Sequence, residues 1–258
     1  MMSNDKQPTD AATRRLHWDA CYNAREVGGY PTQDGGEIAW KTLVRTDNLS
    51  RLSVAGQAAL VAYGVRTIID LRDPSELAME PHAFVRPPGG DDVLIYYNLP
   101  LINFKDEVWL REISPTTATP VYYCLALDIF KPQVRAIMQA VAANASGSVL
   151  IHCHAGKDRT GLIVALLLAL AGVDHEIIAA DYALSNHYLQ PWYQQLMAQH
   201  AHDAERQKQM TEDFKTLPEF MLTVLAHVDQ HYGDVRAYLQ ATGLTMQEIE
   251  QIQQRLRG

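Results

Sequence analysis

The stretch Ser148–Gly161, "SVLIHCHAGKDRTG", decides which fold the sequence predicts. It opens with the apolar, partly β-branched run Ser148–Ile151, which is typical of a buried strand. It leads into the apolar run Gly161–Val173, "GLIVALLLALAGV", which is shorter than the roughly 20 residues that a membrane-spanning helix needs. We therefore predict a buried core helix that begins near Thr160, with Cys153–Arg159 as a short loop between the strand and the helix.

Outside this stretch, short apolar runs alternate with helical patterns. Two further strands are predicted at Thr67–Leu71 and Val93–Leu99, where β-branched and aromatic residues gather. Helices are predicted at Ser53–Gly64 and Lys131–Gly147, and in the second of these the apolar residues recur at helical spacing. Such alternation indicates an α/β fold with a central, mostly parallel sheet flanked by helices.

The C-terminal third of the chain carries helical patterns only. Asp174 stands where it can cap one helix, and the apolar residues between 221 and 228 mark another. Thr245 and Glu248 have the spacing of a capping box at the start of a third helix. Because no segment has the length and composition of a linker between domains, residues 1–258 are predicted to form a single domain.

Residues 185–215 have a composition of their own, with a proline, several aromatic residues and many polar ones. One interpretation is a lid or insertion, in which Tyr188, Trp192 and Tyr193 would cover an aromatic substrate. The other is a pair of ordinary surface helices, because aromatic residues on a helix more often belong to the core. Both interpretations stay open from the sequence.

The composition limits the classes of function. The chain has 258 residues, 47% of them hydrophobic, and a formal net charge of −8. Such a chain can bury a core, and its charge argues against broad binding to nucleic acid or to an anionic membrane. The three cysteines, Cys21, Cys124 and Cys153, have no repeat spacing, which suits a reducing compartment. Since the polar N-terminus lacks the apolar core of a secretory signal, we predict a cytoplasmic protein.

The predicted loop has the features of an anion site. Open α/β sheets bind ligands where a strand ends and a helix begins, and the free N–H groups there favour anions and lower the pKa of a thiol. Five residues separate Cys153 from Arg159, so the loop amides can surround one anion while the guanidinium matches two phosphate oxygens. Thr160 can donate a hydrogen bond to the thiolate. Gly156 lets the backbone approach the ligand, and Gly161 lets the helix pack closely.

Other roles for Cys153 fit less well. A metal site would need His152, Cys153 and His154 to converge, but neighbours on an extended chain point to opposite faces. No second Cys or His pair has the spacing of a zinc site. A nucleotide-binding loop would need Gly-x4-Gly-Lys-Ser/Thr, whereas Lys157 is followed by aspartate. A buried core thiol is the ordinary role of a lone cysteine, and we assign it to the other two cysteines.

The ten residues His152–Gly161, "HCHAGKDRTG", resemble the active-site loop of the cysteine-dependent protein tyrosine phosphatase superfamily, in which His-Cys is followed by five residues, Arg and Ser/Thr. This version of the loop is similar to that of the bacterial and fungal branch. Asn23–Gly29, "NAREVGG", Val44–Glu76 and Ala180–Asn186, "ADYALSN", are similar to other recurring elements of the branch. The resemblance covers most of the chain and implies a protein tyrosine phosphatase-like fold.

The resemblance also implies a chemistry. Cys153 would attack phosphorus and form a phosphocysteine, which water then hydrolyses. Arg159 would stabilise the developing charge together with the loop amides. No metal ion and no organic cofactor would be needed. The phosphate, or a sulfate in its place, would be held by His154, Ala155, Gly156, Lys157, Arg159 and Thr160.

Three aspartates are candidates for the general acid that protonates the leaving oxygen. In this branch the aspartate inside the loop has been proposed, and that residue is Asp158 here. Asp70 and Asp106 are the alternatives. Asn103 stands where the branch would carry an acidic residue on a separate loop, and this departure favours Asp158.

Further polar residues are expected to support the loop. His152 would be a buried residue that orients it, and Asp70 with Arg72 would brace the end of a strand. Arg25, beside Glu26, would either brace the edge of the site or form an ordinary ion pair.

The substrate class stays open at this level. Phosphotyrosine in proteins is the first expectation, and dual specificity for phosphoserine or phosphothreonine is compatible with it. Lys157 also occurs in superfamily members that act on phosphoinositides, so a phosphoinositide or another small phosphate ester is the alternative. A third possibility is a module that captures phosphorylated ligands without turnover, although such modules usually lack the Cys or the Arg. Because relatives of this branch include exported effectors without ordinary signal peptides, export by a non-standard route is the alternative to a cytoplasmic location.

Overall fold

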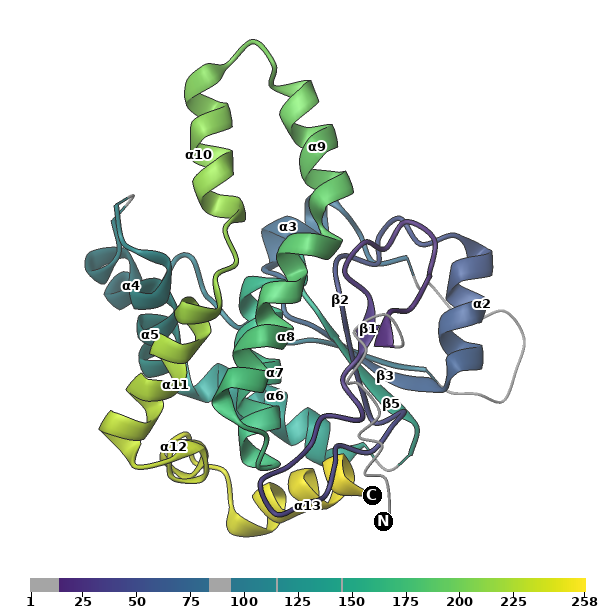
Figure 1. Cartoon of the computed structure of the whole chain (residues 1–258), viewed down its shortest axis with the longest axis vertical. Helices are drawn as coiled ribbons and strands as arrows, with labels where there is room; N and C mark the ends of the chain where they lie inside the picture. The colour runs from purple at the N-terminus through teal and green to yellow at the C-terminus, as the bar shows by residue number, and fades with distance from the viewer. Residues whose placement is uncertain (1–13, 84–93, 115, 145) are drawn as a thin grey trace, which may run out of the picture.

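A five-stranded sheet forms the centre of the molecule (Figure 1). The computed structural model describes residues 14–83, 94–114, 116–144 and 146–258. The strands lie in the order β1-β2-β5-β3-β4, and all neighbours run parallel except β1, which is antiparallel to β2. The predicted mostly parallel sheet is therefore confirmed. The strands are β1 Arg25–Glu26, β2 Leu43–Thr46, β3 Val65–Asp70, β4 Ile95–Asn98 and β5 Ser148–His152.

Helices surround this sheet, and those after β5 confirm the helical C-terminal third. The helices before β5 are α2 Val54–Tyr63, α3 Pro74–Met79, α4 Glu107–Glu112, α5 Thr119–Ile129 and α6 Lys131–Ala143. Those after it are α7 Asp158–Leu170, α8 His175–Tyr188, α9 Gln190–Gln199, α10 Ala204–Phe214, α11 Pro218–Tyr232, α12 Val235–Ala241 and α13 Met246–Arg257.

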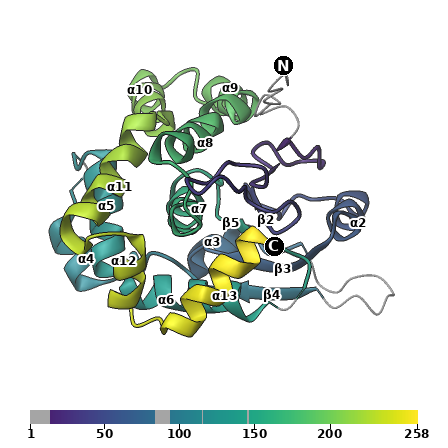
Figure 2. The ribbon, with the colours of Figure 1, turned by 60° about the horizontal axis from the view of Figure 1, so that its bottom comes forward.

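The two faces of the sheet bury different clusters, because successive side chains of a strand point to opposite faces. Leu150 of β5 packs in a small cluster with Val44, Ile68 and Leu60, the last from α2. The neighbours of Leu150 on β5 belong to a larger cluster with residues of α5 to α8 and α11 to α13. Figure 2 shows α2 separated from α6, α7 and α8 by the strands. Nearly every residue of α7 is buried, as predicted for the core helix.

The structure corrects two predicted boundaries. Helix α7 begins at Asp158 instead of near Thr160, so the loop is Cys153–Lys157 and Arg159 belongs to the first helical turn. An aspartate in the first turn is favoured by the positive end of the helix dipole, which explains the earlier start. Helix α6 ends at Ala143 instead of Gly147. Gly147, with φ of +71°, instead turns the chain into β5.

Other predicted elements are found where the pattern placed them. The capping box at the start of α13 is present, with Thr245 accepting from the amide of Glu248. Strand β4 lies within the predicted range, whose first residue, Val93, is outside the described residues. The short strands β1 and β2 were not predicted, because two and four residues carry too little periodicity. Within the described ranges, no helix combines the length and apolar character needed to cross a bilayer.

Within the segment 185–215, residues 190–214 form a helical hairpin that projects from the body of the protein (Figure 1, the green pair α9 and α10). An aromatic cluster lies at its base, where the ring of Phe214 lies 4.4 Å from that of Tyr193 and 5.5 Å from that of Trp192. Tyr188 is buried at the end of α8 and belongs to the core, not to the hairpin.

Candidate active site

Cys153 lies where the sequence placed it, between the carboxyl end of β5 and the N-terminus of α7. It is 2% exposed, at the bottom of the loop Cys153–Lys157. Because β5 is flanked by β2 and β3, the loop stands at the centre of the carboxyl edge of the sheet. The first N–H groups of α7 have no partner inside the helix, so this position suits an anion.

The loop is held from outside through its carbonyl groups. Asn23 Nδ2 donates to the carbonyls of Ala155 and Gly156, at 3.1 Å each, and Arg45 Nη2 donates to the carbonyl of Gly156 at 2.7 Å. Gly156 has φ of +63°, and a Cβ atom there would lie 2.2 Å from the carbonyl oxygen of Thr46. No other residue fits this position. Because the carbonyls are engaged outside, the amides of the loop are available inside.

Asp181 of α8 anchors this support. Its carboxylate accepts from Arg25 Nε at 2.9 Å, from Arg45 Nη1 at 2.6 Å and from the Tyr30 hydroxyl at 3.1 Å, and it is 1% exposed. Burial alone would raise the pKa of Asp181, but the two guanidinium groups outweigh it and hold the pKa far below its usual range. Arg25 also donates to Asn23 Oδ1 at 2.5 Å. Arg25 therefore lies behind the loop, as a brace in a buried network of charges and not as a simple ion pair.

Replacing Asp181 with asparagine is expected to destabilise the fold by about 3–5 kcal/mol at pH 7, because two buried arginines lose their counter-charge. A carboxyl whose pKa is lowered by folding stabilises the protein above its unfolded pKa of about 3.9, and this contribution disappears as the pH falls. Wild-type stability should therefore fall more steeply below pH 4 than that of the variant. Urea unfolding at several pH values measures both effects. Glu212→Gln, which removes only a partly exposed ion pair with Lys215, is the control, with a change within about 0.5 kcal/mol. Equal stability of the two variants would contradict the assigned role.

Arg159 is oriented by Glu76, which had no predicted role. Its Nη1 and Nη2 donate to the two carboxylate oxygens of Glu76, at 2.5 and 2.7 Å. Glu76 is itself fixed as the third residue of the capping box of α3, in which the amide of Asp73 donates to it. Burial alone would raise the pKa of Glu76, but the hydrogen bonds from Arg159 outweigh it and lower the pKa. The guanidinium is thus held in one plane beside the loop.

Asp158 is in contact with a pair of tyrosines. The Tyr123 hydroxyl donates to Asp158 Oδ1, and it also lies 2.8 Å from the Tyr182 hydroxyl. Burial, followed by the neighbouring Asp158, raises the pKa of Tyr123 well above its ordinary value, so the phenol remains a donor. The Asp158 side chain is 37% exposed. The Asp158 carboxyl group is therefore oriented by the buried Tyr123 hydroxyl, and its exposed part is open to a ligand.

Two more residues of the loop region have distinct environments. Lys157 is almost fully buried, and its Nζ donates to the carbonyl of Asp213 at the end of α10 and lies 3.4 Å from Asp158 Oδ1. Thr160 Oγ1 is buried and has no hydrogen-bond partner within the described part of the chain. The lysine thus connects the loop to the hairpin, and the hydroxyl is left to donate to a group that enters the loop.

Asp70, His152 and Asp106, the other candidate residues outside the loop, are buried or serve as a helix cap. Asp70 is fully buried, where it pairs with Arg72 at 2.7 Å and lies 3.5 Å from His152 Nε2. His152 is also fully buried, and burial lowers its pKa despite the nearby Asp70. Asp106 accepts from the amide of Trp109 as the cap of α4. Neither aspartate lines the cleft next to Arg159, so the geometry favours Asp158 as the acid.

A cleft of about 360 Å³ opens beside the end of the loop. Its floor includes Lys157, Asp158 and Arg159, and its walls are mostly aromatic and aliphatic. Phe104 is 40% exposed, and its ring lies 5.9 Å from the guanidinium carbon of Arg159. The walls are formed by Ile102, Phe104, Tyr122, Tyr123 and Leu162, with Ser114, Thr117, Thr119 and Asp213 at the edge.

The other two cysteines are partly buried free thiols that pack against the apolar clusters. Burial raises the pKa of the Cys124 thiol to about 11 and that of Cys21 further. Both thiols are therefore protonated at neutral pH, as fits the core role predicted for them.

A thiol, an arginine and a carboxyl group around a loop between a strand and a helix N-terminus are the groups that a cysteine-dependent phosphatase needs. The chain belongs to the tyrosine phosphatase family, which it matches over residues 16–258. It is 36% identical over 219 residues to a tyrosine-protein phosphatase of Nostoc commune, covering 83% of this chain and 73% of that protein. It is 28% identical to the triple specificity protein phosphatase PtpB of Mycobacterium tuberculosis, covering 84% of this chain and 89% of that protein. The predicted family and enzyme class are confirmed.

One solved structure is weakly similar to this chain. The crystal structure of P. aeruginosa TpbA has 19% sequence identity and a TM-score of 0.37, covering 79% of this chain and 88% of that one. This likeness is too remote to assign any residue.

Proposed function

We propose that this tyrosine phosphatase hydrolyses phosphotyrosine in proteins, with Cys153 as nucleophile, Arg159 as phosphate ligand and Asp158 as general acid. The observation that carries the proposal is the loop itself. Its carbonyls are held from outside by Asn23 and Arg45, which leaves its amides free to bind an anion near Cys153 and Arg159. We propose that His154, Ala155, Gly156, Lys157 and Thr160 complete the phosphate site.

The reaction has two steps. The Cys153 thiolate attacks phosphorus, so that an S–P bond forms and the P–O bond to tyrosine breaks, while Asp158 gives its proton to the leaving phenolate oxygen. Water then attacks phosphorus, Asp158 takes its proton, and the thiolate leaves with inorganic phosphate as product. Arg159 and the loop amides stabilise the charge on the phosphoryl oxygens in both steps. The buried Thr160 hydroxyl is available to stabilise the thiolate when it leaves.

The cleft favours an aromatic ester. Phe104, Tyr122 and Leu162 line the space in front of Asp158 and Arg159, where the ring of a phosphotyrosine would pack. These residues would make fewer packing contacts with the short aliphatic side chain of phosphoserine. A phosphoinositide is the second candidate because of Lys157. The ammonium group of Lys157, however, is already engaged by the carbonyl of Asp213 and the carboxylate of Asp158.

The hairpin is proposed to belong to the same single domain and to act as a lid on the site. It contacts the loop at two places: the ring of Trp192 lies 5.7 Å from that of His154, and Lys157 donates to the end of α10. A lid with these contacts would exclude bulk water while Cys153 attacks phosphorus, and it would have to admit a water molecule for the second step. A cytoplasmic location stays a prediction from the sequence.

Substrate class is tested by steady-state assays on a phosphotyrosine peptide, a phosphothreonine peptide and a short-chain phosphoinositide, with a chelator present. We expect the highest kcat/KM on phosphotyrosine. A higher value on the phosphoinositide would establish the second candidate instead.

Replacing Asp158 with asparagine is expected to lower kcat/KM, which reports the first step, by about 10²-fold on phenyl phosphate, whose leaving group needs a proton. The loss should be far smaller on an aryl phosphate whose phenol is strongly acidic. A series of aryl phosphates with leaving groups of different pKa measures this dependence in both enzymes. Asp106→Asn is the matched control and should retain the wild-type pattern. An equal loss on every substrate would remove Asp158 from the role of acid.

A further inference from the structure

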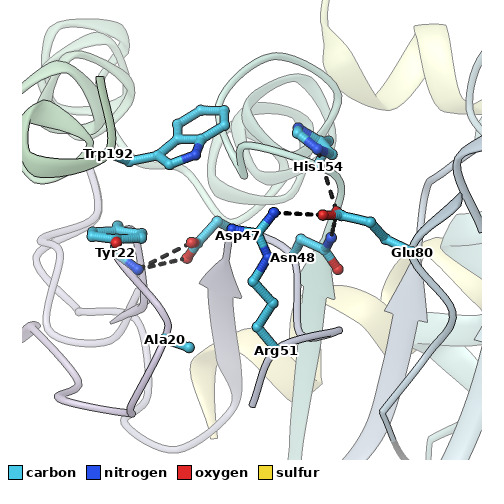
Figure 3. A pocket seen from close by; sticks show the side chains of 8 residues that line it. All are labelled: Ala20, Tyr22, Asp47, Asn48, Arg51, Glu80, His154 and Trp192. Atoms are coloured by element: carbon cyan, nitrogen blue, oxygen red, sulfur yellow. Dashed lines mark hydrogen bonds and ion pairs between the residues drawn. The ribbon is translucent and has the colours of Figure 1, made fainter. Parts of the chain in front are cut away.

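A second pocket lies at the other end of the active loop (Figure 3). The cleft described above adjoins Lys157, Asp158 and Arg159, whereas this pocket adjoins His154, the residue after the nucleophile. The segments that form it are far apart in the sequence, and none of its residues has a part in the reaction proposed above except His154. It is lined by Ala20, Tyr22, Asp47, Asn48, Arg51, Glu80, His154 and Trp192.

The pocket contains a buried carboxylate. Asp47 is 6% exposed, and it accepts from the amides of Tyr22 and Asn23 and from the Thr46 hydroxyl at 2.9–3.1 Å. Within the described ranges no salt bridge to Asp47 is found. Burial raises the pKa of Asp47 despite these hydrogen bonds. A cation that entered the pocket would relieve this cost of burying an unpaired negative charge.

Glu80 provides a second carboxylate at the rim. It pairs with Arg51 at 2.6 Å, and the side chain of Arg51 is 65% exposed. It also lies 3.5 Å from His154 Nε2. An exposed pair of this kind contributes little and exchanges readily, so an incoming cation can replace Arg51. Among the described residues, the pocket therefore offers two carboxylates against the exposed Arg51 and the imidazole of His154.

Two aromatic side chains form the opposite wall. Figure 3 shows the ring of Tyr22 on the side of Asp47 away from Glu80, and the indole of Trp192 above Asp47. The Tyr22 hydroxyl donates to Gln195 of α9 at 3.3 Å, which ties this wall to the hairpin. Aromatic faces beside carboxylates favour ammonium and guanidinium groups over neutral ones.

We propose that this pocket receives the basic side chain, lysine or arginine, of a residue close to the phosphotyrosine in a protein substrate. An extended peptide advances about 3.3 Å per residue, so a residue a few positions from a phosphotyrosine bound at Cys153 reaches past His154. The inference rests on the phosphotyrosine activity proposed above and assigns it a sequence preference.

The test compares phosphotyrosine peptides that carry either lysine or its uncharged analogue norleucine at each position within three residues of the phosphotyrosine. We expect kcat/KM to be about tenfold higher for lysine at one or two of these positions. Glu80→Gln should reduce this ratio, and Trp192→Leu should reduce it as well. Arg51→Ala should increase it, because it removes the competing cation. The lysine-to-norleucine ratio is compared within each variant, and the small substrate p-nitrophenyl phosphate, which does not reach the pocket, measures any general loss of activity, which the ratio cancels.

The outcomes separate this inference from the proposed function. Turnover of all peptides with a ratio near one at every position would overturn the pocket's role and leave the phosphatase activity intact. A lysine preference that persists unchanged in Glu80→Gln, Trp192→Leu and Arg51→Ala would place the basic subsite elsewhere. Failure to hydrolyse any phosphotyrosine peptide would overturn both.

Discussion

Replacing Cys153 with serine is expected to lower kcat by at least about 10⁴-fold on every phosphate ester, because the enzyme loses its nucleophile. Serine is close to cysteine in size, but its hydroxyl does not ionise near neutral pH, so the phosphate should still bind while the S–P bond cannot form. Steady-state assays and calorimetric binding of a phosphotyrosine peptide measure the two effects. Cys21→Ser and Cys124→Ser are the matched controls, since both thiols lie outside the cleft, and they should retain activity.

Rapid denaturation of the wild-type enzyme during turnover should also trap a phosphorylated protein that the serine variant does not give. Activity that survives in Cys153→Ser would mean that another group is the nucleophile. Tight binding without turnover by the wild-type protein would mean that the fold captures phosphorylated ligands only.

Replacing Arg159 with lysine is expected to lower kcat/KM by about 10³-fold, which is the range for loss of an arginine that stabilises a transferring phosphoryl group. Lysine keeps the positive charge but lacks the planar fork that contacts two oxygens at once. It would also release Glu76, which now accepts from both Nη atoms. The same peptide assay and the inhibition constant of vanadate measure the loss.

Glu76→Gln is the variant whose kcat/KM is compared with that of Arg159→Lys. Its side chain keeps one acceptor for the guanidinium, so we expect a loss about tenfold smaller than that of Arg159→Lys. If Arg159→Lys retained most of the wild-type kcat/KM, the arginine would not stabilise the transition state, and the pair with Glu76 would be only structural.

The central part of the fold and site could be predicted because its signals lie close together in the sequence. Strand, nucleophile, loop glycine, arginine and core helix occupy one stretch, Ser148–Val173. The parallel sheet followed from the alternation of apolar runs with helical patterns. For the hairpin, the sequence left a lid and a pair of surface helices equally open. Its position next to the loop depends on contacts between residues far apart in the sequence, such as that of Trp192 with His154.

The supports of the loop could not be predicted in the same way. Glu76 had one usable signal, the capping-box spacing from Asp73 directly after a strand. Arg45 and Asp181 are 136 positions apart, and a single sequence does not show which buried charges meet. Tyr123 gave no signal at all, because a tyrosine in an amphipathic helix is most often an ordinary core residue.

Because its supports come from other parts of the chain, the loop is not expected to keep its active shape when it is transferred to another protein. Asn23 and Arg45 hold the carbonyls, Glu76 holds the arginine, and Asp181 holds the residues that hold the loop. A graft of the ten residues His152–Gly161 onto another strand–loop–helix unit would carry the reacting groups without their shape. Catalytic competence in this protein is therefore a property of the assembled carboxyl edge of the sheet, and it should be lost as soon as that edge loosens, before the helices around it unfold.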